Sequence, residues 1–361
     1  MRSISDTLAE LQRLGPGTSS GSKPQGAVLQ PLAAFGDNLG ALRALLHVPT
    51  GLPAGAPLVV VLHGCTQTAE AYDRGSGWSA LADRFGFAVL YAEQQRANNP
   101  NVCFNWFSPA DIRRGGGETE SIRQMIAAAI ERHGIDRLRV FVTGLSAGGA
   151  MTSVMLATHP ELFAGGAIIA GLPYGTAAGV PQALERMRGH GHDCAMLSQR
   201  VLAASPHRGP WPAVSVWHGT ADSTVSAVNG AMIVDQWRGV HGVGEPDVVE
   251  RIGAHLHRAW HDGSGRLVVE EFTIAGLGHG VPLAAAGDEA CGTPGPHMLE
   301  AGISSTYRIA ASWGIVPAQA PRRATSAASE RPSTPASHAT IGLDVSRTIS
   351  DALRAAGLMR D

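Results

Sequence analysis

The sequence has little excess charge of either sign, and lysine is nearly absent from it. Its 28 Lys and Arg residues and 30 Asp and Glu residues give a formal net charge of -2. Proteins that bind nucleic acid or anionic membranes through charge carry clusters of basic residues. No such cluster occurs here, so we expect neither a nucleic-acid partner nor an electrostatic membrane surface.

Cysteine is also scarce, and its four positions are widely spaced. Cys65, Cys103, Cys194 and Cys291 include no C-x-x-C pair. They are too few for the dense disulfide framework of a small secreted domain, but they leave room for up to two bridges. The cysteines therefore exclude a disulfide scaffold and leave the redox compartment open.

Long apolar runs are missing as well. No run reaches the roughly 18–20 residues that a membrane-spanning helix needs, so we expect no membrane span. Charged and polar side chains interrupt the first 17 residues, where a secretory signal needs an unbroken apolar stretch of roughly 7–15 residues. We expect a short amphipathic helix there and a cytoplasmic protein, with secretion as the alternative.

Changes in composition along the chain predict four regions. Residues 15–27 are rich in Gly, Ser and Pro, and residues 317–338 are small, polar and low in complexity. Such stretches bury too little apolar surface to fold alone. The expected regions are an N-terminal helix and linker (1–30), a catalytic domain (31–316), a low-complexity linker (317–339) and a C-terminal amphipathic helix (340–361).

Within residues 31–316, short β-branched runs alternate with helical patterns. Runs such as LVVVL at 58–62 are apolar throughout, which is typical of strands buried on both faces. This alternation predicts an α/β fold with a mostly parallel sheet flanked by helices, and a helical insertion at about 173–210 over the sheet. The expected strands are 41–48, 58–62, 88–92, 140–143, 166–170, 214–217 and 268–274, and the expected helices are 77–85, 119–133, 148–158, 227–240 and 304–313.

The strongest motif is G-x-S-x-G at residues 144–148. An apolar β run precedes it and a helical run follows, which is the setting of a nucleophile elbow in an α/β-hydrolase. The turn is so tight that side chains at Gly144 and Gly148 would collide with the neighbouring strand and helix. The motif therefore predicts that Ser146 is a nucleophile at the N-terminus of a helix, where amides favour negative charge.

A serine nucleophile needs a base and an acid that orients the base. In this fold the chain order is serine, acid, histidine, and each group follows a strand. Asp222 follows the strand expected at 214–217, and His279 follows the strand expected at 268–274. We expect Asp222 to be the acid and His279 the base, with His297 as the main rival for the base.

The reaction also needs amide donors for the oxyanion of the tetrahedral intermediate. One is expected from Ala147, directly after the nucleophile. The loop that follows residues 58–62 begins His63-Gly64-Cys65-Thr66, an HG-type oxyanion loop. We assign the second donor to the Cys65 amide, with the Thr66 amide as the alternative.

Two further features bear on ligands. The stretch GHGHDC at 189–194 contains metal-binding side chain types, but their spacing matches no common zinc site, so we expect no metal and no other cofactor. Trp106 lies in a loop of about twenty residues, and long loops at strand ends are often functional. Trp106 is expected either to line an acyl pocket or to pack in the core.

Several long segments of this sequence resemble one known family. The segments are LHGCTQTAEAYDRGSGWSALADRFGF, NVCFNWFSP with RRGGGE, TGLSAGGAMTSVMLATHPELFAGGAIIAGLPYG, WHGTAD and GLGHGVPL. They are similar to poly(3-hydroxybutyrate) depolymerase family esterases, which are related to the feruloyl and acetylxylan esterases of carbohydrate esterase family one. The resemblance spans residues 35–316 approximately.

The resemblance implies the same triad and places Trp106 near the substrate. We also expect Thr66 to contact the substrate. It also implies that Cys65 and Cys103 approach each other, so a disulfide between them is a hypothesis. The expected substrate is a hydroxyalkanoate polyester, its oligomers or short-chain esters, and the alternative is a feruloyl or acetylxylan ester. A hypothesis from a different functional class is that the protein is a granule- or polymer-associated binding protein. A homodimer is also expected as a possible partner state.

Overall fold

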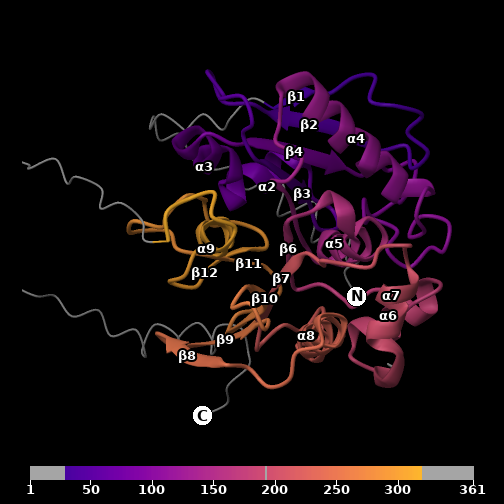
Figure 1. The fold of residues 1–361 in the computed structure, drawn as a ribbon, viewed down its shortest axis with the longest axis vertical. Coiled ribbons are helices and arrows are strands. Elements are labelled where there is room, and N and C mark those ends of the chain that lie inside the picture. Colours follow the sequence, from indigo (N-terminus) through magenta and orange to yellow (C-terminus); the bar gives the residue numbers. More distant parts are fainter. Residues whose placement is uncertain (1–28, 192, 319–361) are drawn as a thin grey trace, which may run out of the picture. The chain divides into compact units, whose positions relative to one another are not determined.

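The computed structural model describes residues 29–191 and 193–318 (Figure 1). The N-terminal helix expected within 1–30, the low-complexity stretch from 319 onward and the C-terminal helix lie outside these residues, so all three remain predictions. Within the described residues, no helix is both long enough and apolar enough to cross a membrane.

The described residues form a ten-stranded sheet in the order β1-β2-β4-β3-β5-β6-β7-β10-β9-β8. Its six central strands, from β4 to β10, run parallel, and β1, β2, β9 and β8 add antiparallel pairs at the edges. The mostly parallel sheet is thereby confirmed. The strands are β1 (Gln30–Pro31), β2 (Arg43–His47), β3 (Leu58–Leu62), β4 (Ala88–Glu93), β5 (Val140–Leu145), β6 (Gly165–Ile169), β7 (Ala213–Gly219), β8 (Val248–Ile252), β9 (His255–His261) and β10 (Leu267–Ile274).

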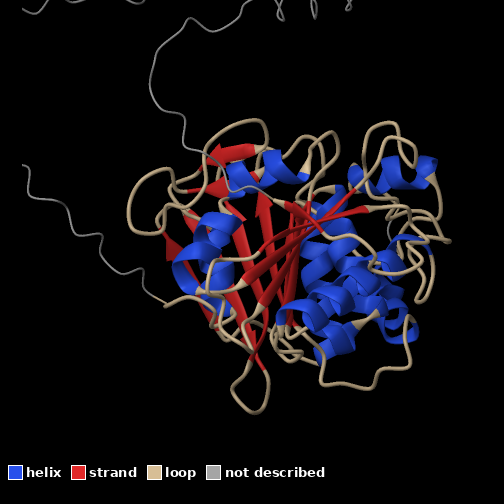
Figure 2. Cartoon of the chain, turned by 90° about the horizontal axis from the view of Figure 1, so that it is seen from above, coloured by secondary structure: helices blue, strands red, loops and turns tan. Residues whose placement is uncertain are grey.

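Helices cover both faces of this sheet (Figure 2). Buried residues of α4, α5 and α8 belong to the apolar cluster on one face, and those of α2, α3 and α9 belong to the cluster on the other. The helices are α2 (Ala69–Ser76), α3 (Trp78–Phe85), α4 (Gly117–His133), α5 (Ala147–Thr158), α6 (Val180–Met187), α7 (Leu197–Ala203), α8 (Val228–His241) and α9 (Ser305–Ser312).

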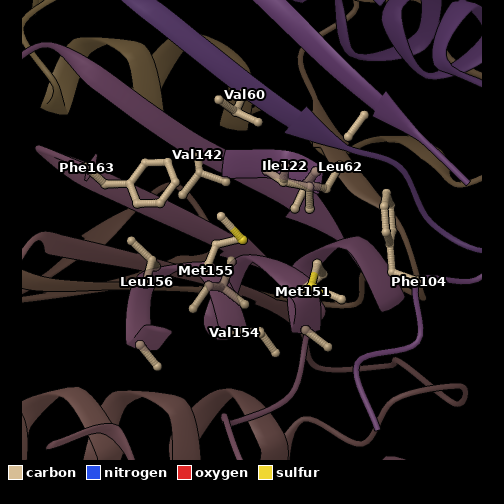
Figure 3. Packing of buried hydrophobic residues seen from close by; sticks show 14 of the residues in the cluster. Val60, Leu62, Phe104, Ile122, Val142, Met151, Val154, Met155, Leu156 and Phe163 are labelled. Carbon is tan, nitrogen blue, oxygen red and sulfur yellow. The ribbon is translucent and has the colours of Figure 1, made fainter. Parts of the chain in front are cut away.

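Strand β3 shows why its sequence is apolar at every position. Val60 and Leu62 belong to one cluster and Val59 to the other, because successive side chains of a strand point to opposite faces. Figure 3 shows Val60 and Leu62 in the packing around the α5 residues Met151 and Met155. Helix α5, which follows Ser146, is buried along its whole length. The serine therefore lies at the start of a fully buried helix.

The expected insertion at about 173–210 contains α6, α7 and a short 3-10 turn at Cys194–Met196. Helix α6 exposes Val180 and Leu184, both of which line the cavity that contains Ser146. This region is helical and covers the site, as the sequence predicts.

Two parts of the fold differ from the sequence predictions. Strands β8 and β9 form a hairpin at the sheet edge where no strand is expected, because β8 is largely exposed and lacks an apolar run. The helix expected at 77–85 is preceded by a second helix, α2, and Gly77 in the left-handed region (φ 78°) separates the two. A Cβ at Gly77 would lie 2.0 Å from the Cys291 carbonyl oxygen, so this junction requires glycine.

A small two-stranded sheet completes the described part of the chain. It pairs β11 (Val281–Leu283) with β12 (Met298–Glu300) in parallel. The segment between these strands reaches back to α2, where the Thr293 amide donates to the Gly75 carbonyl oxygen at 2.9 Å.

Candidate active site

Ser146 lies on a strained turn between β5 and α5. Its backbone has φ 58° and ψ -117°, a region that residues other than glycine rarely adopt. A Cβ at Gly148 would lie 2.1 Å from the Leu62 carbonyl oxygen, and one at Gly144 would lie 2.5 Å from the Gly148 carbonyl carbon. The expected collisions are therefore present, and both glycines are required by close backbone packing.

Asp222 and His279 come together from the loops after β7 and β10. The His279 Nδ1 lies 2.7 Å from the Asp222 Oδ2. The Asp222 side chain is fully buried, and its Oδ1 accepts the amides of Thr224 and Val225 at 2.9 Å each. His297 contacts the backbone carbonyl oxygen of His279 through Nδ1, at 3.1 Å, and makes no contact with this carboxylate. Between the two candidate bases, the carboxylate thus pairs with His279.

A second histidine, His218, also contacts Asp222, and sequence reasoning missed it. Its Nε2 lies 2.9 Å from the Val225 carbonyl oxygen and 3.5 Å from the Asp222 Oδ2. Burial alone would raise the pKa of Asp222, but the contacts from His218 and His279 outweigh burial and hold that pKa well below its usual range. Asp222 is therefore a fixed carboxylate that can stabilise a charged imidazole. The only sequence signal for His218 is its place in the HGTAD loop.

Ser146 and His279 line one cavity of about 440 Å³, which we call the serine cavity. The Ser146 hydroxyl makes no hydrogen bond to any described residue. Nucleophile–base hydrogen bonds are often long in ligand-free enzymes and shorten when substrate binds. A nucleophile candidate and an oriented base therefore lie on the wall of the same cavity.

The candidate oxyanion donors differ in whether they already have an acceptor. The Gly64 amide donates to the Gln67 Oε1 at 2.8 Å, and the Thr66 amide donates to the Asn101 carbonyl oxygen at 2.8 Å. Within the described residues, the amides of Cys65 and Ala147 have no acceptor. This difference favours the Cys65 amide over the Thr66 amide as the second donor, and Thr66 itself lines the serine cavity.

Cys65 is covalently fixed by a disulfide bond to Cys103, so the bridge implied by the family resemblance is confirmed. The two cysteines are 38 positions apart and both line the serine cavity. The bridge joins the oxyanion loop after β3 to the long loop that contains Trp106. It restrains the position of the Cys65 amide.

We expect Cys103→Ser to lower both stability and turnover. Closing a loop of this length stabilises a protein by about 2–4 kcal/mol, so the midpoint of urea unfolding should fall accordingly. The initial rate with a p-nitrophenyl ester should also fall, because the Cys65 amide is less restrained. Cys291→Ser is the matched control, since Cys291 carries a free thiol. If a reducing agent slowed the wild type but not Cys291→Ser, the effect would depend on Cys291. That result would contradict the role given to the Cys65–Cys103 bridge.

Below the oxyanion loop lies a buried polar network. The His63 Nδ1 contacts the Gly64 carbonyl oxygen at 2.7 Å, and its Nε2 accepts the Gln94 amide at 3.0 Å. The Gln94 side chain donates to the Glu118 Oε1 at 2.6 Å, and Glu118 in turn accepts the backbone amide of Asn105. The network therefore links the oxyanion loop to the Trp106 loop through groups that sequence reasoning did not select.

Burial governs the ionisation of this network. It lowers the pKa of His63 from 6.5 to about 4, against a raising effect of the Gly64 carbonyl. It also raises the pKa of Glu118 to about 8, although hydrogen bonds from Asn105 and Gln94 oppose this shift. His63 is therefore neutral at pH 7 and can accept the Gln94 amide.

The lowered pKa of His63 predicts acid sensitivity of the fold. Between pH 6.5 and about 4 the unfolded chain binds a proton at His63 and the folded chain does not, so stability falls as the pH falls through this window. We expect a loss of up to about 1.4 kcal/mol per pH unit from this residue. Urea unfolding at pH 7, 6 and 5 should show a flatter dependence in His63→Gln. An equal slope in both proteins would refute the prediction.

Trp106 both packs in the core and lines the serine cavity. It is 7% exposed and makes an edge-to-face contact with Phe107 at 5.6 Å between ring centroids. Apolar side chains of α6, among them Leu184 and Met187, line the same cavity. This combination suits the apolar part of an acyl group.

The described residues contain no group of three or more His, Cys, Asp or Glu side chains close enough to hold a metal ion.

Comparison with known proteins gives one family and several relatives. A family model described as "Esterase PHB depolymerase" matches residues 42–259. The chain is 46% identical to a protein named Poly(3-hydroxyalkanoate) depolymerase C from Paucimonas lemoignei, over 80% of this chain and 70% of that protein. It is 31% identical to Acetylxylan esterase A from Aspergillus oryzae, over 74% and 88% of the two chains. Among solved structures, an acetyl xylan esterase from Aspergillus awamori matches with a TM-score of 0.64 and 28% identity, over 70% of this chain and 94% of that chain.

Proposed function

We propose that this chain, which belongs to the esterase PHB depolymerase family and is a carboxylic ester hydrolase, cleaves hydroxyalkanoate esters. The reaction proceeds through an acyl-enzyme on Ser146. The observation that carries the assignment is the Asp222–His279 pair, 2.7 Å apart, whose imidazole lines the same cavity as a serine on a nucleophile elbow.

In the proposed first half-reaction, the Ser146 Oγ attacks the ester carbonyl carbon and its proton passes to the His279 Nε2. The amides of Cys65 and Ala147 donate to the resulting oxyanion. The bond to the leaving oxygen then breaks, and His279 returns the proton to that oxygen, which releases the alcohol. Asp222 keeps the Nδ1 proton of His279 in place and stabilises the imidazolium.

In the second half-reaction, water takes the place of the alcohol. His279 removes a proton from the water as it attacks the acyl carbon. Collapse of the second tetrahedral intermediate breaks the bond to Ser146, and His279 returns the proton to the Ser146 oxygen. The products are a carboxylic acid and the free enzyme.

The substrate class rests on the cavity walls and on the 46% identical relative. Trp106, Leu184 and Met187 offer apolar contacts to a short branched acyl group. The second candidate, an acetylxylan or feruloyl ester, is favoured by relatives of those names at 30–31% identity. The hypothesis that the protein only binds a granule or polymer is not retained, because the chain is an ester hydrolase.

A substrate panel distinguishes the two candidates. We expect kcat/KM for a 3-hydroxybutyrate trimer to exceed that for methyl ferulate and for acetylated xylan by at least roughly tenfold, a difference of about 1.4 kcal/mol in transition-state binding. A p-nitrophenyl ester series from acetyl to octanoyl would define the acyl chain length that the serine cavity accepts. A clear preference for acetylated xylan would overturn the hydroxyalkanoate assignment.

The Cys65–Cys103 disulfide bears on location. Stable disulfides persist in oxidising compartments and are rare in the cytosol, so the bridge supports the secreted alternative over the cytoplasmic expectation. Esterase activity in the medium of cells that express the natural gene would test this. The homodimer stays a prediction.

A further inference from the structure

A second cavity adjoins the serine cavity, and we call it the arginine cavity because Arg74 lines it. Its volume is about 810 Å³, within the range of roughly 300–1,000 Å³ typical of small-ligand sites. It lies between α2, the start of α3 and the segment 291–298. Thr66, Gln67 and His297 line both cavities. A ligand bound at Ser146 can therefore extend from one cavity into the other.

The floor of the arginine cavity is fixed by close backbone packing. A Cβ at Gly292 would lie 2.1 Å from the Gly75 carbonyl oxygen, and one at Gly77 would lie 2.0 Å from the Cys291 carbonyl oxygen. The Thr293 amide donates to Gly75 as well. Because the two walls are in direct contact at their base, the cavity is formed before any ligand binds.

The charges that line this cavity leave one cation without a partner. Arg74 is exposed, and no carboxylate or other hydrogen-bond acceptor pairs with it among the residues that the structure describes. The two acids in the lining have hydrogen-bond partners other than Arg74, and the Asp83 side chain is 54% exposed. Asp83 pairs with the His47 Nε2 at 2.7 Å, and Asp73 accepts the Ser79 amide and the Tyr91 hydroxyl. The Arg74 guanidinium is thus the group available to an anion here.

The position of His297 indicates which part of the substrate enters this cavity. His279 protonates the leaving oxygen in the proposed mechanism, so that oxygen must lie beside His279. The His297 ring lies next to the His279 ring, with 5.9 Å between centroids, at the junction of the two cavities. The leaving alcohol is therefore directed toward the arginine cavity, while the acyl group lies against Trp106.

The chemistry of a hydroxyalkanoate oligomer matches this direction. When one of its esters is cleaved, the acyl fragment ends in a hydroxyl at its far end, and the leaving fragment ends in a free carboxylate. Only the leaving fragment brings an anion, and it enters the cavity that contains the unpaired arginine. Arginine is well suited to bind a carboxylate through two parallel hydrogen bonds.

We propose that the arginine cavity binds the leaving fragment of a hydroxyalkanoate oligomer and that Arg74 binds its terminal carboxylate. This proposal rests on the proposed function. Binding of this carboxylate makes the enzyme selective for soluble oligomers with a free carboxyl end. The distance between Arg74 and Ser146 sets the number of units released.

The test compares 3-hydroxybutyrate dimers, trimers and tetramers that end in a carboxylate with the same oligomers that end in a carboxamide. The carboxamide removes the charge and is not itself an ester. We expect the wild type to prefer the acid form by roughly tenfold in kcat/KM, mostly through KM, at one or two of these lengths. Low ionic strength keeps an exposed contact measurable.

Variants of Arg74 complete the experiment. Arg74→Gln should remove the preference for the acid form, and Arg74→Lys should retain part of it. The preference is measured within each variant as the ratio of kcat/KM for the acid to kcat/KM for the carboxamide, so a general change in activity cancels. Arg137→Gln is the matched control, since Arg137 is exposed and lines neither cavity. If oligomers with either end were cleaved equally well, the Arg74 proposal alone would be overturned. If the enzyme cleaved neither kind of oligomer but still hydrolysed p-nitrophenyl butyrate, both this proposal and the hydroxyalkanoate substrate would be overturned.

Discussion

Replacing Ser146 by alanine should reduce kcat for p-nitrophenyl butyrate by roughly 10⁴- to 10⁶-fold, the range seen when a serine nucleophile is removed from a triad. The remaining rate would come from the oxyanion donors and substrate binding. Stability should change little, because alanine occupies the same backbone conformation and loses only a hydroxyl that has no hydrogen-bond partner among the described residues.

A second measurement separates loss of the nucleophile from loss of the fold. A fluorophosphonate should label the wild type on the peptide that contains Ser146 and leave Ser146→Ala unlabelled. Ser153→Ala serves as control, because Ser153 lies two turns along α5, donates to the Leu172 carbonyl oxygen and lines neither cavity. It should keep both labelling and activity. Substantial activity in Ser146→Ala would exclude the acyl-enzyme mechanism.

The parts of this site that the sequence predicts are those determined by local geometry. Ser146, Asp222 and His279 each follow a strand of the parallel sheet, and the carboxyl ends of such strands meet at one edge. The order of three polar residues after three apolar runs was therefore enough to select them. Gly144 is equally local, since a Cβ there would meet the Gly148 backbone in the same turn. A Cβ at Gly148 would instead meet the Leu62 carbonyl oxygen on β3, so only the motif itself marks that glycine in the sequence.

The supporting residues escape prediction because their partners are distant in the sequence. Gln94 contacts His63 across 31 positions and Glu118 across 24. Neither pairing follows from periodicity or from a known motif. The Cys65–Cys103 pairing came from family resemblance, since four cysteines allow several connectivities. Long-range contacts of this kind are visible only once the sheet has brought the loops together.

The same contrast holds for the fold. The buried parallel strands are predicted well, because strands covered on both faces are apolar at every position. The hairpin of β8 and β9 lies at an exposed edge, where the sequence VVERI carries no comparable signal. Helix α2 is obscured by Gly75 and by Gly77 directly after its end, and both positions are determined by packing against the segment 291–298.

Replacing Asp222 by asparagine should reduce kcat by roughly 10⁴-fold with little change in the fold. The Oδ1 of Asp222 accepts two backbone amides, from Thr224 and Val225, and an asparagine can keep its carbonyl oxygen there. Its amide nitrogen would then replace the Oδ2 that contacts the His279 Nδ1. An amide donates where the carboxylate accepts, so His279 would carry its proton on Nε2 and could not accept the proton of Ser146.

Asp262→Asn is the control for this substitution. Asp262 also accepts backbone amides of its own turn, from Ser264 and Arg266, and it lines neither cavity. Its replacement should leave kcat unchanged. Fluorophosphonate labelling gives an independent reading, since Asp222→Asn should retain Ser146 but react with the probe far more slowly than the wild type. If Asp222→Asn kept the wild-type labelling rate, the carboxylate would not be needed to orient the base, and another group would have to be sought for that role.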